Sequence, residues 1–409
     1  MVVFLVLACM IRMDLGASVP ETSSKPITLP PHPRLRFNDS DIERLRKLIG
    51  NGPAADSMAK KLYANVSSHV DYLLAQPLPD NGSGLVCDTI RDHIYAYGLM
   101  YRMSSDKQRK KALADRSARE MLLVAAMGNW TWRFLSVAET THALSIGYDW
   151  FYHDLTPSQR AGIEDGIARL GLERGRQCYL YNCTWIPGIP GVGNCTNCWW
   201  IRAPMNWNVV SNGGMAIGAL AIGDVPRYAD IARTVLSHAL GNVPPAIAQY
   251  SNDGAWPEGP GYWCYITKYL LATADTLIYA LGHDHGIMST PGVDKTAHYA
   301  LQMHHNPSLK AFNYGDAEEA DGDIDYQNRY AANLLGLQWH FGHAVGFAPG
   351  VAARQALQPP PITEASSWDE IVLSLLRWSR DGSMDDIAAL PTTAFYLDKG
   401  AAIWWPGLK

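Results

Sequence analysis

Apolar residues recur three and four positions apart along most of this chain, which is the spacing of one buried helix face. Glycine, proline, asparagine and aspartate stand between the apolar stretches, where turns are expected. We therefore predict an all-α fold of helical hairpins, arranged as an incomplete or closed α/α toroid. The predicted helices cover 54–76, 90–103, 107–127, 134–152, 157–176, 208–223, 226–248, 262–282, 292–303 and 327–341.

The two ends of the chain depart from this pattern. Residues 19–36 are rich in proline and serine and predict an extended lead-in, after which Asn38 caps a helix that ends at Gly50. The predicted toroid domain spans 37–385. Two short apolar stretches, 393–397 and 401–405, then predict strands, so we interpret 390–409 as the start of a truncated β-sandwich domain.

The first residues predict export from the cell. An apolar run over 1–11 is too short to span a bilayer, and small residues follow at Gly16, Ala17 and Ser18. This pattern is typical of a cleaved signal peptide over 1–18, and a buried N-terminal strand is the alternative. We therefore expect a secreted, extracellular protein with no membrane span in the mature chain.

Glycosylation signals and cysteines agree with an oxidising, extracellular location. Six cysteines remain after removal of the signal peptide, and four of them crowd into 178–198. Disulfides are favoured there over a zinc site, because no histidine lies close by in sequence. The predicted glycosylation sites are Asn38, Asn65, Asn81, Asn129, Asn182 and Asn194. The disulfide candidates are Cys178, Cys183, Cys195 and Cys198.

The amino-acid composition limits the kinds of molecule that this protein is expected to bind. The net charge of −5 argues against a nucleic-acid-binding protein, which usually carries a basic face. The 14 tryptophans and 20 tyrosines have two interpretations, as core residues or as platforms on which the apolar face of a sugar stacks.

Residues 250–269 form the first candidate site. Asp253 and Gly254 predict a turn, and the stiff stretch 258–261 leads into a helix on which Tyr262, Tyr265 and Tyr269 share a face. One interpretation is aromatic core packing. The other is a tyrosine at the helix start that transfers protons in a cleft, with neighbours that stabilise the phenolate.

A second candidate site is the stretch that begins Asn206-Trp207-Asn208 and precedes an apolar helix. An asparagine here either caps the helix or donates its amide to a substrate carboxylate, while Trp207 lines a subsite. Two further segments are weaker candidates. Glu139 and His142 predict structural hydrogen bonds between hairpins. The acidic loop 312–319 is either simply exposed, or it offers a carboxylate to a cleft or binds a cation.

At these residues the chain resembles the heparinase II/III-like polysaccharide lyases. The resemblance covers roughly 30–409 and rests on Asp253-Gly-x-Trp-Pro-Glu-Gly-Pro-Gly-Tyr-Trp263, on Asn206-Trp207-Asn208 with 212–214, on the helix 138–150 and on 313–316. It implies an N-terminal α/α toroid followed by β-sandwich domains. It also implies a carbon–oxygen lyase that cleaves a uronic-acid polysaccharide by β-elimination.

The resemblance assigns roles residue by residue. Asn206 would neutralise the substrate carboxylate, and Tyr262 would act as base and acid, with Tyr265 as the second candidate for that role. Glu258 would hold the loop or orient the site. The residues expected to contact substrate are Trp207, Asn208, Asp253, Trp256, Trp263, Tyr314 and Asp316. We expect no cofactor and no metal.

The chain departs from the family at Trp207, where many of these lyases carry a histidine. Three other functions stay open: a uronyl epimerase, a non-catalytic carbohydrate-binding protein, and an inverting glycoside hydrolase. The hydrolase would need two facing carboxylates from Asp253, Glu258 and Asp316. The expected partner is an acidic polysaccharide, while the sequence leaves its identity and the oligomeric state undetermined.

Overall fold

A computed structural model describes residues 27–130, 133–181, 198–304, 311–312, 314–315, 323–363, 367–390, 393–396 and 401–404. The longer helices are α1 (Asp39–Ile49), α2 (Ser57–Ala75), α3 (Asp88–Met103), α4 (Lys107–Ala125), α5 (Phe134–Trp150), α6 (Pro157–Gly166), α7 (Glu173–Tyr181), α8 (Asn206–Ile222), α9 (Ala229–Asn242), α11 (Pro260–Leu281), α12 (Thr296–Met303), α13 (Ile324–Phe341), α14 (Ala348–Ala356) and α15 (Trp368–Leu376). The short helices are α10 (Pro244–Ile247) and α16 (Met384–Ala388), and the strands are β1 (Thr393–Tyr396) and β2 (Ala401–Trp404).

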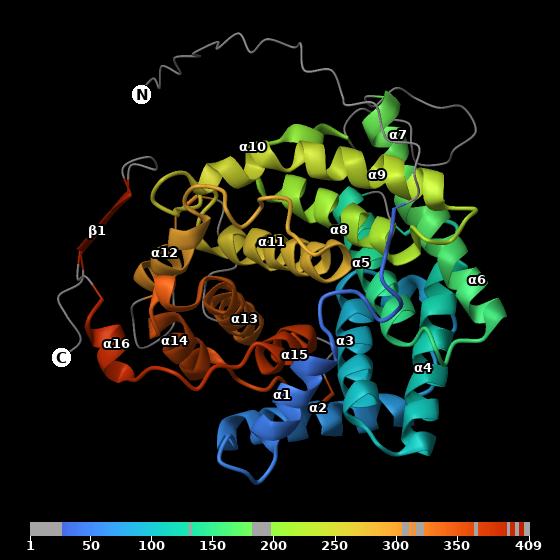
Figure 1. Ribbon diagram of the computed structural model, residues 1–409, viewed down its shortest axis with the longest axis horizontal. Coiled ribbons are helices and arrows are strands. Elements are labelled where there is room, and N and C mark those ends of the chain that lie inside the picture. The colour runs from blue at the N-terminus through green and yellow to red at the C-terminus, as the bar shows by residue number, and fades with distance from the viewer. Residues whose placement is uncertain are drawn as a thin grey trace.

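The all-α prediction is confirmed, and the helices form an inner and an outer set. Inner helices α3, α5, α8, α11, α13 and α15 each contact the next in this order, and α15 contacts α3 in turn. Helices α2, α4, α9 and α14 pack outside them, as Figure 1 shows. Small residues let the inner helices approach closely. A side chain at Gly214 on α8 would place its Cβ 2.4 Å from the carbonyl oxygen of Ala138 on α5.

Most of the predicted helices are present within a few residues. The cap at Asn38 is confirmed, since its side chain accepts hydrogen bonds from the backbone of Ser40 and Asp41. The stretch 157–176 runs from α6 through a π-helical turn at Ile167–Leu172 into α7, and 226–248 divides at Pro244. Helices α14 and α15 were not predicted, because both are too short for a long periodic pattern, and α14 also contains Pro349 and Gly350.

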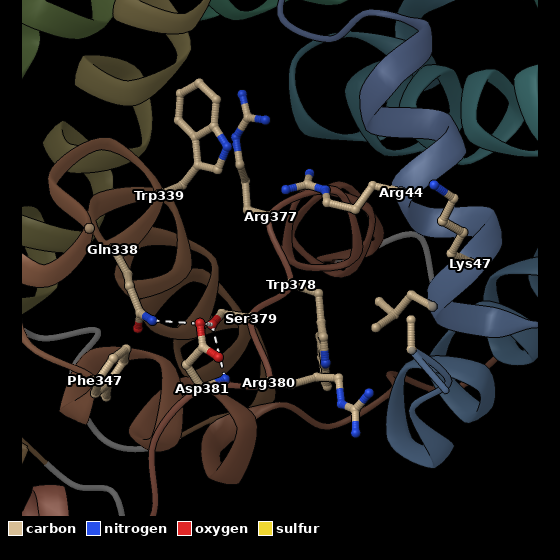
Figure 2. A pocket seen from close by; sticks show the side chains of 13 residues that line it. Arg44, Lys47, Gln338, Trp339, Phe347, Arg377, Trp378, Ser379, Arg380 and Asp381 are labelled. Carbon is tan, nitrogen blue, oxygen red and sulfur yellow. Dashed lines mark hydrogen bonds between the residues drawn. The ribbon is translucent and has the colours of Figure 1, made fainter. Parts of the chain in front are cut away.

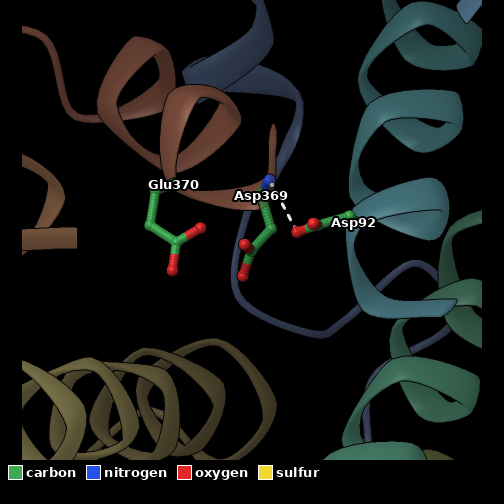
Figure 3. Close-up of side chains that lie close together, drawn as sticks. All are labelled: Asp92, Asp369 and Glu370. Carbon is green, nitrogen blue, oxygen red and sulfur yellow. Dashed lines mark hydrogen bonds between the residues drawn. The ribbon is translucent and has the colours of Figure 1, made fainter. Parts of the chain in front are cut away.

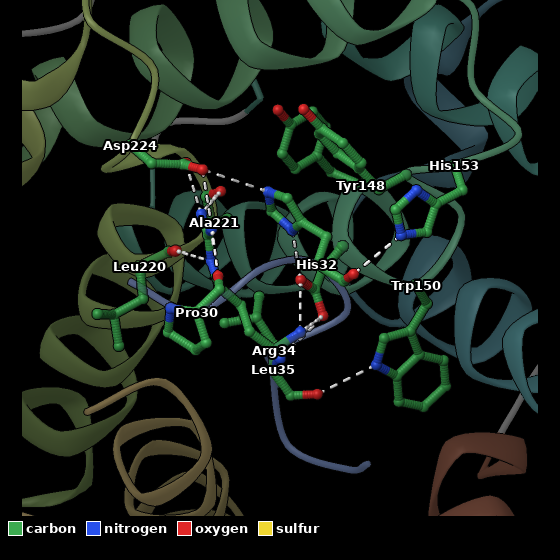
Figure 4. A network of polar contacts seen from close by, with 12 residues as sticks. Pro30, His32, Arg34, Leu35, Tyr148, Trp150, His153, Leu220, Ala221 and Asp224 are labelled. Atoms are coloured by element: carbon green, nitrogen blue, oxygen red, sulfur yellow. Dashed lines mark hydrogen bonds and ion pairs between the residues drawn. The ribbon is translucent and has the colours of Figure 1, made fainter. Parts of the chain in front are cut away.

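The lead-in is extended over its described part and is held by two carboxylates, the buried Asp149 and the exposed Asp224. Asp149, at the end of α5, accepts hydrogen bonds from the backbone N–H groups of Arg34 and Leu35, and its Oδ1 lies 2.6 Å from Nδ1 of His32. The Arg34 guanidinium donates to Asp224 at 2.6 and 2.9 Å. Figure 4 shows this network, which fastens the lead-in to α5 and to the end of α8.

The C-terminal residues form an antiparallel pair of strands, β1 and β2, in which Thr393 pairs with Trp404 and Tyr396 with Ala401. Over the described ranges these two strands make up the whole sheet. The larger β-sandwich therefore stays a prediction, and the predicted signal peptide lies outside the described residues. None of the described helices has the length and apolar character that crossing a bilayer requires.

Candidate functional site

Glu258 joins the beginnings of α8 and α11. Its Oε2 accepts the backbone N–H of Asn206 at 2.7 Å, and its Oε1 accepts the Asn206 side-chain amide, also at 2.7 Å. Met205, the residue that precedes α8, makes no side-chain cap, so the carboxylate satisfies one of the open N–H groups at the helix start. Two of the residues chosen from the sequence are thus in contact, and Glu258 orients Asn206.

Asn206 is almost fully buried, and one of its side-chain atoms lacks a described partner. Its exposed fraction is 1%, and its Oδ1 makes no hydrogen bond with the described residues. The amide group carries two hydrogens, and the bond to Glu258 uses one of them. Oδ1 and the second amide hydrogen of Asn206 are therefore both without a partner among the described residues, in nearly closed surroundings.

Tyr262 lies in the first turn of α11. Gly259 precedes this helix with φ at +93°, a conformation that favours glycine, and Pro260 occupies the first helical position. Tyr262 is half-buried and packs against the core. The positive end of the α11 dipole favours negative charge at this turn, so a phenolate is more stable here than in mid-helix.

Tyr265, one turn further along α11, has a different environment. Its hydroxyl donates to Oε1 of Glu139 on α5 at 2.9 Å, and Nη1 of Arg91 on α3 lies 3.3 Å from the same oxygen. Burial raises the pKa of Tyr265 well above its ordinary value, and the neighbouring Glu139 adds to the effect. Tyr265 is therefore a neutral hydrogen-bond donor and a poor base.

Glu139 itself is a buried carboxyl group with a shifted pKa. Burial and then the negative charge of Asp88 raise its pKa to about 7, while Arg91 opposes the shift. His142, one turn along α5, bonds through Nε2 to the Tyr95 hydroxyl at 2.8 Å. Both residues thus link α5 to neighbouring helices, as expected for structural hydrogen bonds between hairpins.

A cluster of charged side chains lies next to Glu139 and His142, at the start of α15. Asp369 Oδ2 is 2.8 Å from Nε of Arg91 and 2.7 Å from Nζ of Lys268, which also contacts Glu370. Its backbone N–H donates to Asp92 on α3 at 3.3 Å. Figure 3 shows the three carboxyl groups, whose oxygens lie within 4.8 Å of one another. Buried charges of both signs therefore join α3, α11 and α15.

Bound protons neutralise the negative charge of these three carboxyl groups better than a metal ion would. Burial and then Asp369 raise the pKa of Asp92 well above its ordinary value and that of Glu370 to about 7. Burial would also raise the pKa of Asp369, but Arg91 and Lys268 lower it. These two cations already contact Asp369 and would repel a divalent ion at the same carboxylates.

The tryptophans divide into buried and accessible ones. Trp256 and Trp263 have no exposed surface, and Nε1 of Trp263 donates to the Thr296 hydroxyl at 2.7 Å. Neither ring offers a face to a substrate in this structure. The prediction that Trp256 and Trp263 contact substrate is therefore corrected: both pack in the core. Trp207 is half-buried, and its ring lies 4.9 Å from that of Trp199, which is 45% exposed.

Asn208 was also expected to contact substrate, and the structure places it elsewhere. It is fully buried, and its amide donates to the carbonyl oxygens of Ile201 at 2.9 Å and Asn242 at 3.0 Å. Both bonds hold the segment before α8 and the end of α9, so Asn208 is structural, although it lies inside α8 and does not cap the helix, whose cap position is Met205. Helix periodicity explains the difference, because Asn206 and Asn208 face different directions two residues apart.

Tyr314 and Gly315, which follow α12, pack against the Glu258 segment. The Tyr314 hydroxyl donates to the carbonyl oxygen of Trp256 at 2.6 Å, and Gly315 packs so tightly that a Cβ would lie 2.8 Å from the Glu258 backbone. Asp253 accepts the backbone N–H of Ala255 at 3.1 Å and shapes the preceding turn. Asp316 lies outside the described residues.

The predicted modification sites are partly described. Asn38, Asn81 and Asn129 are exposed and Asn65 is half-buried, whereas Asn182 and Asn194 lie outside the described residues. Among the cysteines, Sγ of Cys178 lies 2.6 Å from Sγ of Cys198, and both are buried. Cys183 and Cys195 fall outside the described ranges, so the full pairing of the cysteines stays a prediction.

Sequence reasoning missed three residues around the site. Trp199 is adjacent to Trp200 in a Trp-Trp pair whose first ring is exposed, and this doublet was the available signal. Arg91 and Lys268 each interrupt an apolar helix pattern with a charge, which indicates a buried ion pair.

Comparisons with known proteins do not assign this chain to a family. The chain matches no model of a known protein family, and a search of curated proteins finds no match either.

Proposed function

We propose that this protein is a secreted polysaccharide lyase that cleaves a uronic-acid-containing polymer by β-elimination, on a scaffold in which the six inner helices form an α/α toroid. The observation that carries the proposal is the pair of hydrogen bonds that Asn206 donates to Glu258. It ties a neutral amide donor at the start of α8 to the loop that leads directly to Tyr262. The reaction requires both groups.

The electrostatics of this region favour an anionic substrate. Helices α8 and α11 both begin here, and the N-terminal ends of helices attract negative charge. In the proposed reaction, Asn206 donates to the uronate carboxylate and stabilises the charge that develops when C5 loses its proton. Tyr262, as phenolate, accepts that proton, and the bond from C4 to the leaving oxygen breaks as the C4–C5 double bond forms. Tyr262 then gives the proton to the leaving oxygen and returns to the phenolate when it next loses a proton.

The accessible aromatic rings support a sugar ligand. Trp199 and Trp207 form an edge of the region at the start of α8, and a pyranose presents an apolar face that packs on such rings. A hydrolase is less well supported, because Glu258 is already held by two bonds from Asn206. In the proposed reaction, Glu258 positions Asn206.

Product masses test the reaction class. The full chain is incubated with a uronate hexasaccharide in deuterium oxide, and the products are weighed by mass spectrometry. A lyase gives fragments whose masses sum to that of the substrate, since elimination adds no water. After back-exchange into ordinary water, fragments that sum to substrate plus one water would indicate a hydrolase, and deuterium retained on carbon in an uncleaved chain would indicate an epimerase. Either outcome would overturn the proposal.

A further inference from the structure

A pocket of about 410 Å³ lies at the end of the inner helices opposite the candidate site. Near the candidate site, Lys268 of α11 contacts Glu370 at the start of α15. One helical turn or more further along, Asp275 of α11 contacts His340 near the end of α13 and Arg377 just after α15. These helices therefore run in the same direction, and the pocket lies at their C-terminal ends, as Figure 2 shows.

Four basic side chains line the pocket. Arg44 and Lys47 come from α1, and Arg377 and Arg380 come from the segment after α15. Asp381 is the one carboxylate in the described lining. This local excess of positive charge contrasts with the net charge of −5 of the whole chain.

The four basic groups differ in how far they are neutralised. Asp41 lies 3.2 Å from both Arg44 and Arg377, and Asp275 lies 3.3 Å from Arg377. Lys47 and Arg380 are exposed and form no ion pair with the described residues, although Arg380 donates to the Pro53 carbonyl oxygen at 2.9 Å. Their charges are therefore available to an anion.

Aromatic rings and unused donors complete the pocket. The Arg377 guanidinium stacks on Trp339, with its carbon 3.7 Å from the ring centroid. Trp378 also lines the pocket and is 6% exposed. Nε of Arg377 and Nε1 of Trp378 find no acceptor among the described residues. Buried donors without partners cost free energy, so an oxygen-rich ligand or water is expected near them.

We propose that this pocket is a second, non-catalytic binding site for an acidic sugar unit. The volume falls within the range of small-ligand sites. The half-buried Trp339 ring suits the apolar part of a sugar, and Lys47 with Arg380 suits a carboxylate or sulfate group on it. The inference goes beyond the proposed reaction and does not depend on it, because no residue of the candidate site takes part.

Two anionic probes and one charge-reversal variant test this site. The full chain is mixed with a hyaluronan tetrasaccharide, which carries only carboxylates, or with a keratan sulfate tetrasaccharide, which carries only sulfates. Hydrogen exchange is followed at the backbone of 377–382, and affinity is measured by calorimetry. The variant combines Lys47→Glu with Arg380→Glu. The control combines Lys61→Glu with Lys107→Glu, which makes the same change in charge on exposed parts of α2 and α4.

With at least one probe, we expect slower exchange at 377–382 in the wild type and the control, and loss of this protection in the Lys47→Glu/Arg380→Glu variant. The affinity of that site should fall about tenfold or more in the variant, and should weaken as salt is added. The probe that protects identifies carboxylate or sulfate as the preferred anion.

Two results would overturn the inference. One is the absence of protection at 377–382 in the wild type with both probes at saturating concentration. The other is equal protection in the wild type and the charge-reversal variant. Because exchange is read at 377–382, a failure of the proposed lyase reaction would leave this result unchanged.

Discussion

Tyr262 and Tyr265 show how two tyrosines on one helix can differ in chemistry. Tyr265 donates to Glu139 and is held neutral by burial, whereas Tyr262 lies in the first turn of α11, where the helix dipole favours a phenolate. We expect Tyr262→Phe to lower kcat about 10²- to 10⁴-fold, the usual contribution of a proton-transfer residue. Its unfolding free energy should stay within about 1 kcal/mol of the wild type.

Tyr265→Phe is the matched variant. It removes the hydroxyl that donates to Glu139, so the free energy of unfolding should fall by about 1–3 kcal/mol while kcat changes less than in Tyr262→Phe. Steady-state kinetics and urea unfolding of both variants check the pair. A larger loss of kcat in Tyr265→Phe than in Tyr262→Phe would reverse the two assignments.

Glu139 makes a specific prediction about pH. Its pKa is raised in the folded state to about 7, so the folded protein binds a proton that the unfolded chain has already lost between about pH 4.5 and 7. The stability that this group contributes is therefore present at low pH and lost as the pH rises through 7. Glu139→Gln should remove that part of the dependence, which amounts to at most about 3 kcal/mol.

The measurement is urea unfolding at pH 5 and pH 8. The wild type should lose more free energy of unfolding between these values than Glu139→Gln, and the exposed Glu43→Gln on α1 should follow the wild type. Identical pH dependence in the wild type and Glu139→Gln would mean that Glu139 has an ordinary pKa in the folded protein.

At the scale of elements, Glu258 fixes the start of α8 relative to α11. Glu258→Ala removes both acceptors of Asn206 and leaves buried N–H groups without a partner, so the free energy of unfolding should fall by about 1–3 kcal/mol. Activity should fall as well, since Asn206 loses its orientation. Thermal unfolding and kinetics of the variant check both effects. Full activity with an unchanged unfolding midpoint would show that Asn206 needs no such support.

The lead-in is the second element whose attachment can be tested. Asp149→Asn replaces the acceptor of the Arg34 and Leu35 N–H groups and of His32, so we expect a loss of about 2–4 kcal/mol of unfolding free energy. Protease cleavage within 27–37 should become faster. The exposed Asp165→Asn on α6 is the control. Equal stability of the two variants would contradict a clamping role for Asp149.

The sequence predicts the long helices well, because their apolar periodicity and their caps are local signals. Asn38 caps α1 as expected, and Thr156, followed by a proline, caps α6 in the same way. The short apolar helix α15 escaped prediction, and with it the cluster that Asp369 forms with Arg91 and Lys268. Contacts between residues hundreds of positions apart depend on the fold, and no local pattern encodes them.

For the same reason, only part of the candidate site could be predicted from the sequence. Asn206 and Glu258 were chosen from separate motifs and are hydrogen-bonded. The sequence motifs do not show which of their side chains are buried. Trp256 and Trp263 carry sugar-binding rings by type but are fully buried, whereas Trp199, which no motif singled out, is exposed.

At the scale of the whole molecule, the inner helices bring the beginnings of α8 and α11 together at one end and the basic pocket at the other. The central claim is that the first of these ends performs β-elimination. The most direct measurement incubates the full chain with alginate, heparan sulfate, chondroitin and hyaluronan, and follows the ultraviolet absorbance of the C4–C5 double bond. We predict a rise with at least one polymer that Tyr262→Phe abolishes. New reducing ends without any rise in absorbance, or no change with any of the four, would contradict it.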